Sequence, residues 1–183
     1  GEMHINGLEY AKTYGISNLY QFDILKTPFV DEFNAICMFD VLEHIEKDEL
    51  ALKNAAKMLK NGGRIIITVP SHKCLWSNVD DNSGHKRRYT KRMIYDLIEK
   101  TDFKLLYISH FFFLIFPFLY LRALLNKKKY KIENTDKLAD KLGLKINPFV
   151  NGILNFICKI EFVLFKIFPF NVGGSMIIVC EKN

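Results

Sequence analysis

The chain has 183 residues, 49% of them hydrophobic and 25% charged, which is the composition of an ordered domain with a real core. This composition excludes a disordered tail, a collagen-like fibre and a small disulfide scaffold. The formal charge of +6 is a mild basicity that permits anionic partners without requiring one. Sixteen Phe residues indicate either a large buried volume or an apolar exposed surface.

Cysteine usage and apolar runs indicate a cytoplasmic protein. The four cysteines show no paired spacing, which favours free thiols in a reducing compartment. They are Cys37, Cys74, Cys158 and Cys180. The longest apolar run, 111–121, has eleven residues and contains Pro117, so it is too short to span a bilayer. No secretory signal is visible at the start.

Helices and strands alternate in the first 110 residues. Periodicity predicts a helix over 5–14, short strands over 18–22 and 33–39, and a helix over 48–60. The continuous apolar run 64–69 predicts a strand buried on both faces, as in parallel sheets covered by helices.

The second half continues this alternation and then changes character. Thr90 is expected to cap a helix that runs to Lys100, and 103–110 to form a strand. Two apolar helices are predicted within 111–168, and a last strand over 175–180. The alternation predicts an α/β fold with a mostly parallel sheet.

Polar residues follow the ends of the predicted strands, which is where open α/β sheets bind ligands. Asp23 follows the first strand, Asp40 the second, and Ser71-His72 the third. A capping or turn role is the alternative for any one of them. Several at one edge of a sheet favour a functional site.

Three motifs in order resemble the class I S-adenosylmethionine-dependent methyltransferases, in the branch typified by quinone-biosynthesis enzymes. They are FDVLEHI (39–45), LKNGGRIIITVPSHKCLWS (59–77) and GHKRRYTK (84–91). The resemblance implies a Rossmann-like sheet built from 1–110 and 170–183, in which the last two strands form an antiparallel pair at the edge. Residues 111–169 would be a helical insertion or cap.

The resemblance also implies a set of cofactor-binding residues. Glu2 corresponds to the acid that accepts both ribose hydroxyls of S-adenosyl-L-methionine, and Asp23 to the acid that accepts the adenine amino group, with Ile24 packing beside it. Phe39 corresponds to the residue near the sulfonium, which an aromatic face suits. On this resemblance we expect the family's glycine-rich loop, its central first strand and most of its second to have no counterpart among the given residues, which start at Gly1. We therefore expect the C-terminal part of a methyltransferase, which alone binds the cofactor weakly or not at all.

Methyl transfer needs a general base only where the acceptor loses a proton. His72, at the end of a strand, is the best-placed candidate, and His44 and His85 are alternatives. A structural, hydrogen-bonded role is the competing interpretation for each. Trp76 is expected to wall the acceptor pocket or to join the core.

Two further patterns are weighed against structural roles. His44, His72, His85 and Asp80 are metal-ligand types without a recognised ligand spacing, so no metal is expected. The basic run 86–92 offers Arg87 and Arg88 to a phosphate of the substrate, or enters a helix with internal ion pairs. Nucleic acid is not expected as a partner.

The apolar segment 111–168 surrounds a basic linker at Lys127-Lys128-Lys129. It could cap the acceptor pocket, lie on anionic lipid or form a dimer face. The cap is favoured, and its apolar character indicates a lipid-linked or otherwise apolar acceptor, within the predicted class of small or lipid-linked acceptors. The function predicted is S-adenosylmethionine-dependent methylation in the cytoplasm, with membrane-surface contact through 111–168 left open. The alternative is a membrane-surface module whose methyltransferase-like core is inactive.

Overall fold

The computed structural model describes residues 1–125 and 148–183. Its elements in chain order are α1 (Ile5–Thr13), η1 (Ile24–Lys26), β1 (Phe33–Phe39), η2 (Leu42–His44), α2 (Asp48–Met58), β2 (Leu59–Pro70), η3 (Lys73–Leu75), α3 (Asn78–Asn82), α4 (Lys91–Ile98), β3 (Phe103–Phe111), α5 (Phe116–Leu125), α7 (Pro148–Phe165) and β4 (Ser175–Lys182). The basic linker at Lys127-Lys128-Lys129 lies outside the described residues.

The strands form one four-stranded sheet in the order β1-β2-β4-β3. β1 and β2 are parallel, with Ile36 opposite Ile65 and Phe39 opposite Thr68. β4 is antiparallel to both of its neighbours. The α/β fold is confirmed, and so is the antiparallel final pair with β3 at the edge of the sheet.

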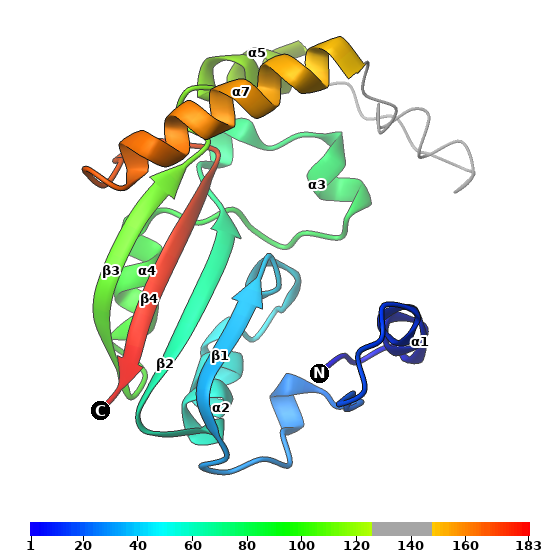
Figure 1. Ribbon diagram of the computed structural model, residues 1–183. Helices are drawn as coiled ribbons and strands as arrows, with labels where there is room; N and C mark the ends of the chain where they lie inside the picture. The colour runs from blue at the N-terminus through cyan, green and yellow to red at the C-terminus, as the bar shows by residue number, and fades with distance from the viewer. Residues whose placement is uncertain (126–147) are drawn as a thin grey trace.

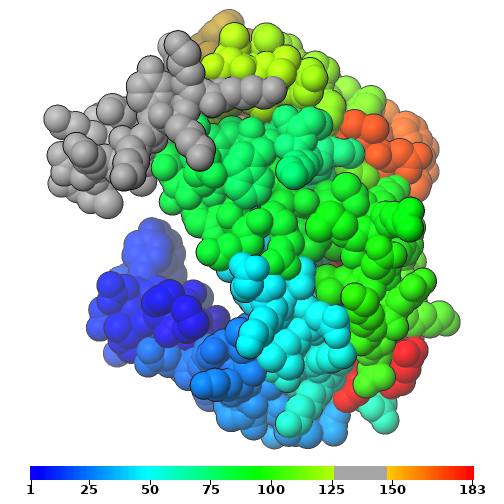
Figure 2. Space-filling model, turned by 180° about the vertical axis from the view of Figure 1, so that it is seen from behind, coloured from blue at the N-terminus to red at the C-terminus, as the bar shows by residue number. Residues whose placement is uncertain are grey.

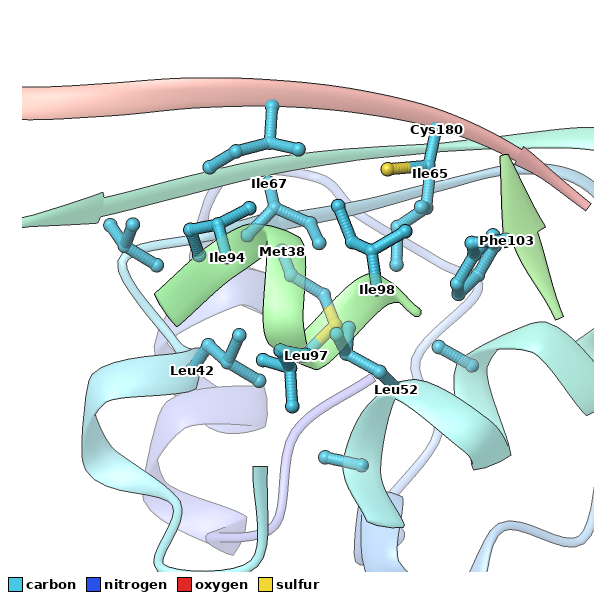
Figure 3. Close-up of a cluster of buried hydrophobic side chains, with 14 of the residues drawn as sticks. Met38, Leu42, Leu52, Ile65, Ile67, Ile94, Leu97, Ile98, Phe103 and Cys180 are labelled. Atoms are coloured by element: carbon cyan, nitrogen blue, oxygen red, sulfur yellow. The ribbon is translucent and has the colours of Figure 1, made fainter. Parts of the chain in front are cut away.

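The core lies between the sheet and the helices α2 and α4, which cover one face (Figure 1). Ile65, Ile67 and Val69 of β2 point into this core and are 2% exposed or less, whereas Ile66 and Thr68 between them are half-buried. The prediction that 64–69 is buried on both faces is therefore wrong, because among the described residues the opposite face lacks such a helical cover. Figure 3 shows the packed side chains of the cluster.

The N-terminal residues stand beside the free edge of β1 (Figure 1). The helix predicted over 5–14 is confirmed as α1. The strand predicted over 18–22 is wrong, because its backbone makes a single parallel bridge, between Glu2 and Gln21. One bridge supplies too few ladder hydrogen bonds to hold a strand. Figure 2 shows an open hollow between these residues, in dark blue, and the body of the protein.

The helices α5 and α7 form a separate layer beyond the ends of β3 and β4 (Figure 1). Of the sixteen Phe residues, all of them described, only Phe103 and Phe170 are buried. The sequence left two explanations open, and the structure selects the apolar exposed surface. α7 is long and apolar enough to cross a membrane by length and composition, with 6% of that stretch buried. All four cysteines are free, as expected.

Candidate functional site

The turn after β1 is fixed by a reciprocal pair of side-chain hydrogen bonds. Asp40 has a left-handed backbone with φ of 50°, which Asp tolerates better than most residues. Its N–H donates to Oγ1 of Thr68 at 3.0 Å, and the same hydroxyl donates to Oδ1 of Asp40 at 3.1 Å. This turn leaves the ring of Phe39 at the strand end with 57% of its surface exposed.

Glu2 and Asp23 lie on neighbouring stretches of backbone, which the bridge between Glu2 and Gln21 joins. Oε1 of Glu2 accepts from the N–H groups of Met3 and His4 at 2.8 and 2.9 Å. Oδ1 of Asp23 accepts from the N–H of Leu25 at 2.8 Å and caps η1. In each carboxylate one oxygen accepts from local backbone, and the other oxygen has no hydrogen bond among the described residues.

Ile24 and Phe39 stand in different settings. Ile24 packs against the core, and its carbonyl accepts from Nδ2 of Asn54 at 2.8 Å. Among the described residues, no hydrogen bond or ring contact joins Phe39 to Glu2 or to Asp23. The backbone bridge places the chain segments of Glu2 and Asp23 side by side, and no described contact joins either residue to Phe39 at the end of β1.

A buried carboxylate organises the polar segment 71–89. Asp80, which is fully buried, forms a capping box with Ser77 in the first turn of α3. Arg88 donates to both of its oxygens, at 2.7 and 3.1 Å, and Nδ1 of His85 lies 2.9 Å from Oδ1. Burial raises the pKa of Asp80, but these bonds outweigh it and hold that pKa below its usual range. Asp80 therefore stays charged and orients the imidazole of His85.

The other nitrogen of His85 faces a second buried acid. Nε2 of His85 lies 3.9 Å from Oε1 of Glu43, and the His85 ring meets that of His44 edge-on at 4.7 Å. Ligand atoms of Glu43, His44 and His85 lie within 4.8 Å of one another. Two imidazoles and a carboxylate could hold a divalent cation. His72, which the sequence grouped with these histidines, is not part of the cluster.

Burial controls protonation in this cluster. Glu43 is fully buried, and within the described chain neither of its oxygens has a hydrogen-bond partner. Burial, with Asp40 and Asp80 nearby, raises the pKa of Glu43 to about 7. Burial and the neighbouring His85 lower the pKa of His44. Sequence reasoning missed Glu43, although its place inside FDVLEHI, one residue from His44, was a usable signal.

His72 lies apart from the cluster of Glu43, His44 and His85, and its ring packs against two other aromatic rings. It has a left-handed backbone with φ of 59°, and its ring stacks on that of His110 at 5.1 Å and meets Phe116 edge-on at 5.5 Å. Burial, with Arg88 nearby, lowers the pKa of His72, so the ring is neutral near pH 7. Its Nε2 is buried without a hydrogen-bond partner among the described residues.

The predicted acceptor-side residues are engaged in local contacts. Nε1 of Trp76 donates to Oδ1 of Asp81 at 3.1 Å. Arg87 pairs with Asp48 and donates to the carbonyl of Glu46. Arg88, bound to Asp80, also donates to the carbonyl of Ser71 at 3.2 Å. Arg87 and Arg88 of the basic run 86–92 therefore form internal ion pairs, as the alternative to phosphate binding predicted.

Comparison with protein families gives one match. A family model described as "Methyltransferase domain" matches residues 8–108, which is more than half of the chain. The matched stretch contains most of α1, the parallel pair β1 and β2, and every candidate residue above except Glu2 and His110. No curated protein matches the sequence.

Solved structures share the fold at low identity. An S-adenosylmethionine-dependent methyltransferase from Thermotoga maritima is 16% identical, with a TM-score of 0.54. The match covers 98% of this chain and 70% of the Thermotoga chain. One from Archaeoglobus fulgidus is 15% identical with a TM-score of 0.52, covering 98% and 73%. The [4+2]-cyclase SpnF is 17% identical with a TM-score of 0.54, covering 96% of this chain, which spans 60% of the cyclase.

Proposed function

The chain belongs to the methyltransferase-domain family, and on that premise we propose that it transfers a methyl group from S-adenosyl-L-methionine to a small or lipid-linked acceptor. The family match over residues 8–108 carries this proposal. The fold alone does not select a reaction, because one structural neighbour is named a cyclase.

Glu2 and Asp23 on one side, and Phe39 at the end of β1 on the other, each suit a different part of the cofactor. S-adenosyl-L-methionine offers hydroxyl and amino donors, for which Glu2 and Asp23 each keep a carboxylate oxygen. Its sulfonium is a cation, for which the exposed ring of Phe39 provides a face. When bound, the cofactor supplies an activated methyl group for in-line displacement. The contribution of the protein is then to hold and align the reactants.

His72 is the base in this proposal wherever the acceptor loses a proton. Its lowered pKa keeps the ring neutral and able to accept a proton near pH 7. His85 differs, because Asp80 holds its Nδ1 and its Nε2 faces Glu43. His85 therefore positions the segment 71–89 and, with His44, flanks the acceptor side.

Cofactor binding tests the proposal without knowledge of the acceptor. Titration of the full-length protein with S-adenosylhomocysteine should give saturable heat, and Glu2→Gln or Asp23→Ala should weaken binding by about tenfold or more through loss of a hydrogen bond to a charged group. Asp96→Asn, on the exposed side of α4, is the matched control and should bind as the wild type does. Equal binding by all variants would show that neither carboxylate contacts the cofactor, and absence of any heat from the full-length protein would overturn the proposal.

The base is tested once an acceptor is in hand. His72→Asn should lower kcat by about 100-fold and remove the acidic limb of the pH profile. His85→Asn should change kcat and KM without removing that limb. The reverse pattern would move the role of base to His85.

A further inference from the structure

The helices α5 and α7, with the turn that follows α7, carry an exposed apolar surface. We call it the apolar platform and define it by six side chains that are 57–73% exposed. They are Phe118, Leu125, Phe156, Phe162, Val163 and Ile167. Scattered apolar residues are normal on a protein surface, but so many large exposed apolar side chains on two helices of one layer indicate an interaction site.

The platform belongs to helices that are anchored to the domain. The carboxylate of Glu161 is buried and accepts from the N–H groups of Phe112 and Leu114. The ring of Phe165 packs edge-on to Tyr107 of β3 at 6.2 Å. If α7 crossed a bilayer, it would carry Glu161 away from these donors into hydrocarbon, at a high cost. α7 is therefore fixed along the domain with its apolar side turned outward.

The net charge of the protein resides in the same part of the chain. Residues 111–172 contain ten Lys or Arg and four Asp or Glu, a net charge of +6, whereas the rest of the chain contains sixteen of each. The one acid on α5 and α7 is the buried Glu161, and Arg122, Lys159 and Lys166 are exposed. An apolar surface that carries exposed cations, and no exposed acid on its described helices, is complementary to an anionic bilayer. A second copy would instead bring like charges together.

We propose that the apolar platform rests on the surface of an anionic lipid bilayer. The platform side chains insert at the boundary between headgroups and acyl chains, and Arg122, Lys159 and Lys166 meet the lipid phosphates. α5 and α7 form a layer beyond the ends of β3 and β4, on the side toward which β1 and β2 point (Figure 1). The bilayer would therefore face the edge of the sheet that carries Phe39 and His72.

Vesicle co-sedimentation of the full chain tests this surface. The wild type should sediment with vesicles that contain phosphatidylglycerol, less as salt rises, and weakly with phosphatidylcholine alone. Phe156→Asp combined with Phe162→Asp should weaken binding by about tenfold or more, because two exposed rings become charged. Tyr10→Asp combined with Tyr14→Asp on α1 is the matched control, since those rings are 66% and 70% exposed, and it should bind as the wild type does.

A second variant guards against misfolding of the first. Lys159→Glu combined with Lys166→Glu leaves the apolar side chains in place and should abolish the preference for phosphatidylglycerol. No sedimentation at low salt would overturn the proposal, as would equal binding by every variant. A dimer in light scattering that the Phe variant abolishes, without vesicle binding, would assign the platform to a second copy. The assay contains neither cofactor nor acceptor, so its result is independent of methyl transfer.

Discussion

The sheet with α2 and α4 and the layer of α5 and α7 follow opposite patterns. In the first region, α4 buries Ile94, Leu97 and Ile98 and turns its charged residues outward. In the second, α7 buries one residue, Glu161, and turns Phe156 and Phe162 outward. The two regions therefore suit different surroundings. The first matches water, and the second matches an apolar medium over most of its outer surface.

This comparison predicts unequal costs for removing apolar side chains. Ile178→Ala, at a fully buried position of β4, should lower the free energy of unfolding by about 2–5 kcal/mol through a cavity in the core. Phe162→Ala, at an exposed position of α7, should change it by less than about 0.5 kcal/mol. Chemical denaturation in the absence of lipid measures both. A large loss from Phe162→Ala would mean that the exposed ring is covered in solution, and the contrast between the regions would fail.

Most of the first region could be predicted from the sequence. Phe33–Phe39 is the observed strand to the residue, and Thr90 caps α4 by accepting from the N–H of Met93. These elements follow from local periodicity and capping, which sequence reveals directly. The burial of β2 on one face could not be predicted, because it depends on which helices cover the sheet. The strand over 18–22 failed for a similar reason, since a strand needs a partner.

His110, which lies where the sheet meets the layer of α5 and α7, should make the free energy of unfolding depend on pH. His110, at the end of β3, is 2% exposed, and burial together with the neighbouring His72 lowers its pKa from 6.5 to about 4. As pH falls from 6.5 to 4, the unfolded chain takes up a proton that the folded chain does not, so stability is lost. The loss should be about 3 kcal/mol.

A difference measurement isolates this effect. Other groups titrate in the same range, including Glu43, whose raised pKa acts in the opposite direction. The difference in unfolding free energy between the wild type and His110→Gln cancels their common contribution. That difference should change by about 3 kcal/mol between pH 7 and pH 4. A difference that does not vary with pH would show that His110 titrates normally in the folded protein.

The candidate site was less predictable than the fold. The sequence indicated that polar residues gather after the strands, but their partners depend on tertiary structure. Arg87 and Arg88 were read as candidates for phosphate, and their partners are Asp48 and Asp80. Glu43 carries no local signal of burial, because its loss of solvent follows from the packing of η2 against β2 and α2. Sequence periodicity reveals the helices and strands, whereas the pairing of charged side chains depends on how those helices and strands pack together.

The smallest expected effect concerns the attachment of the second region to the first. In the wild type, the N–H groups of Phe112 and Leu114 each donate to a different oxygen of Glu161. In Glu161→Gln, the single amide oxygen can accept from one of these N–H groups, and the NH₂ group faces the other. One buried donor is then unpaired, which should cost about 1–3 kcal/mol. The loss should be local, so hydrogen exchange at Phe112 and Leu114 should accelerate while that of β2 and β4 stays unchanged. Lys159→Gln, exposed on the same helix, is the control. If exchange also accelerates in β2 and β4, the two regions unfold together, and the helical layer is an integral part of the core rather than an attached surface.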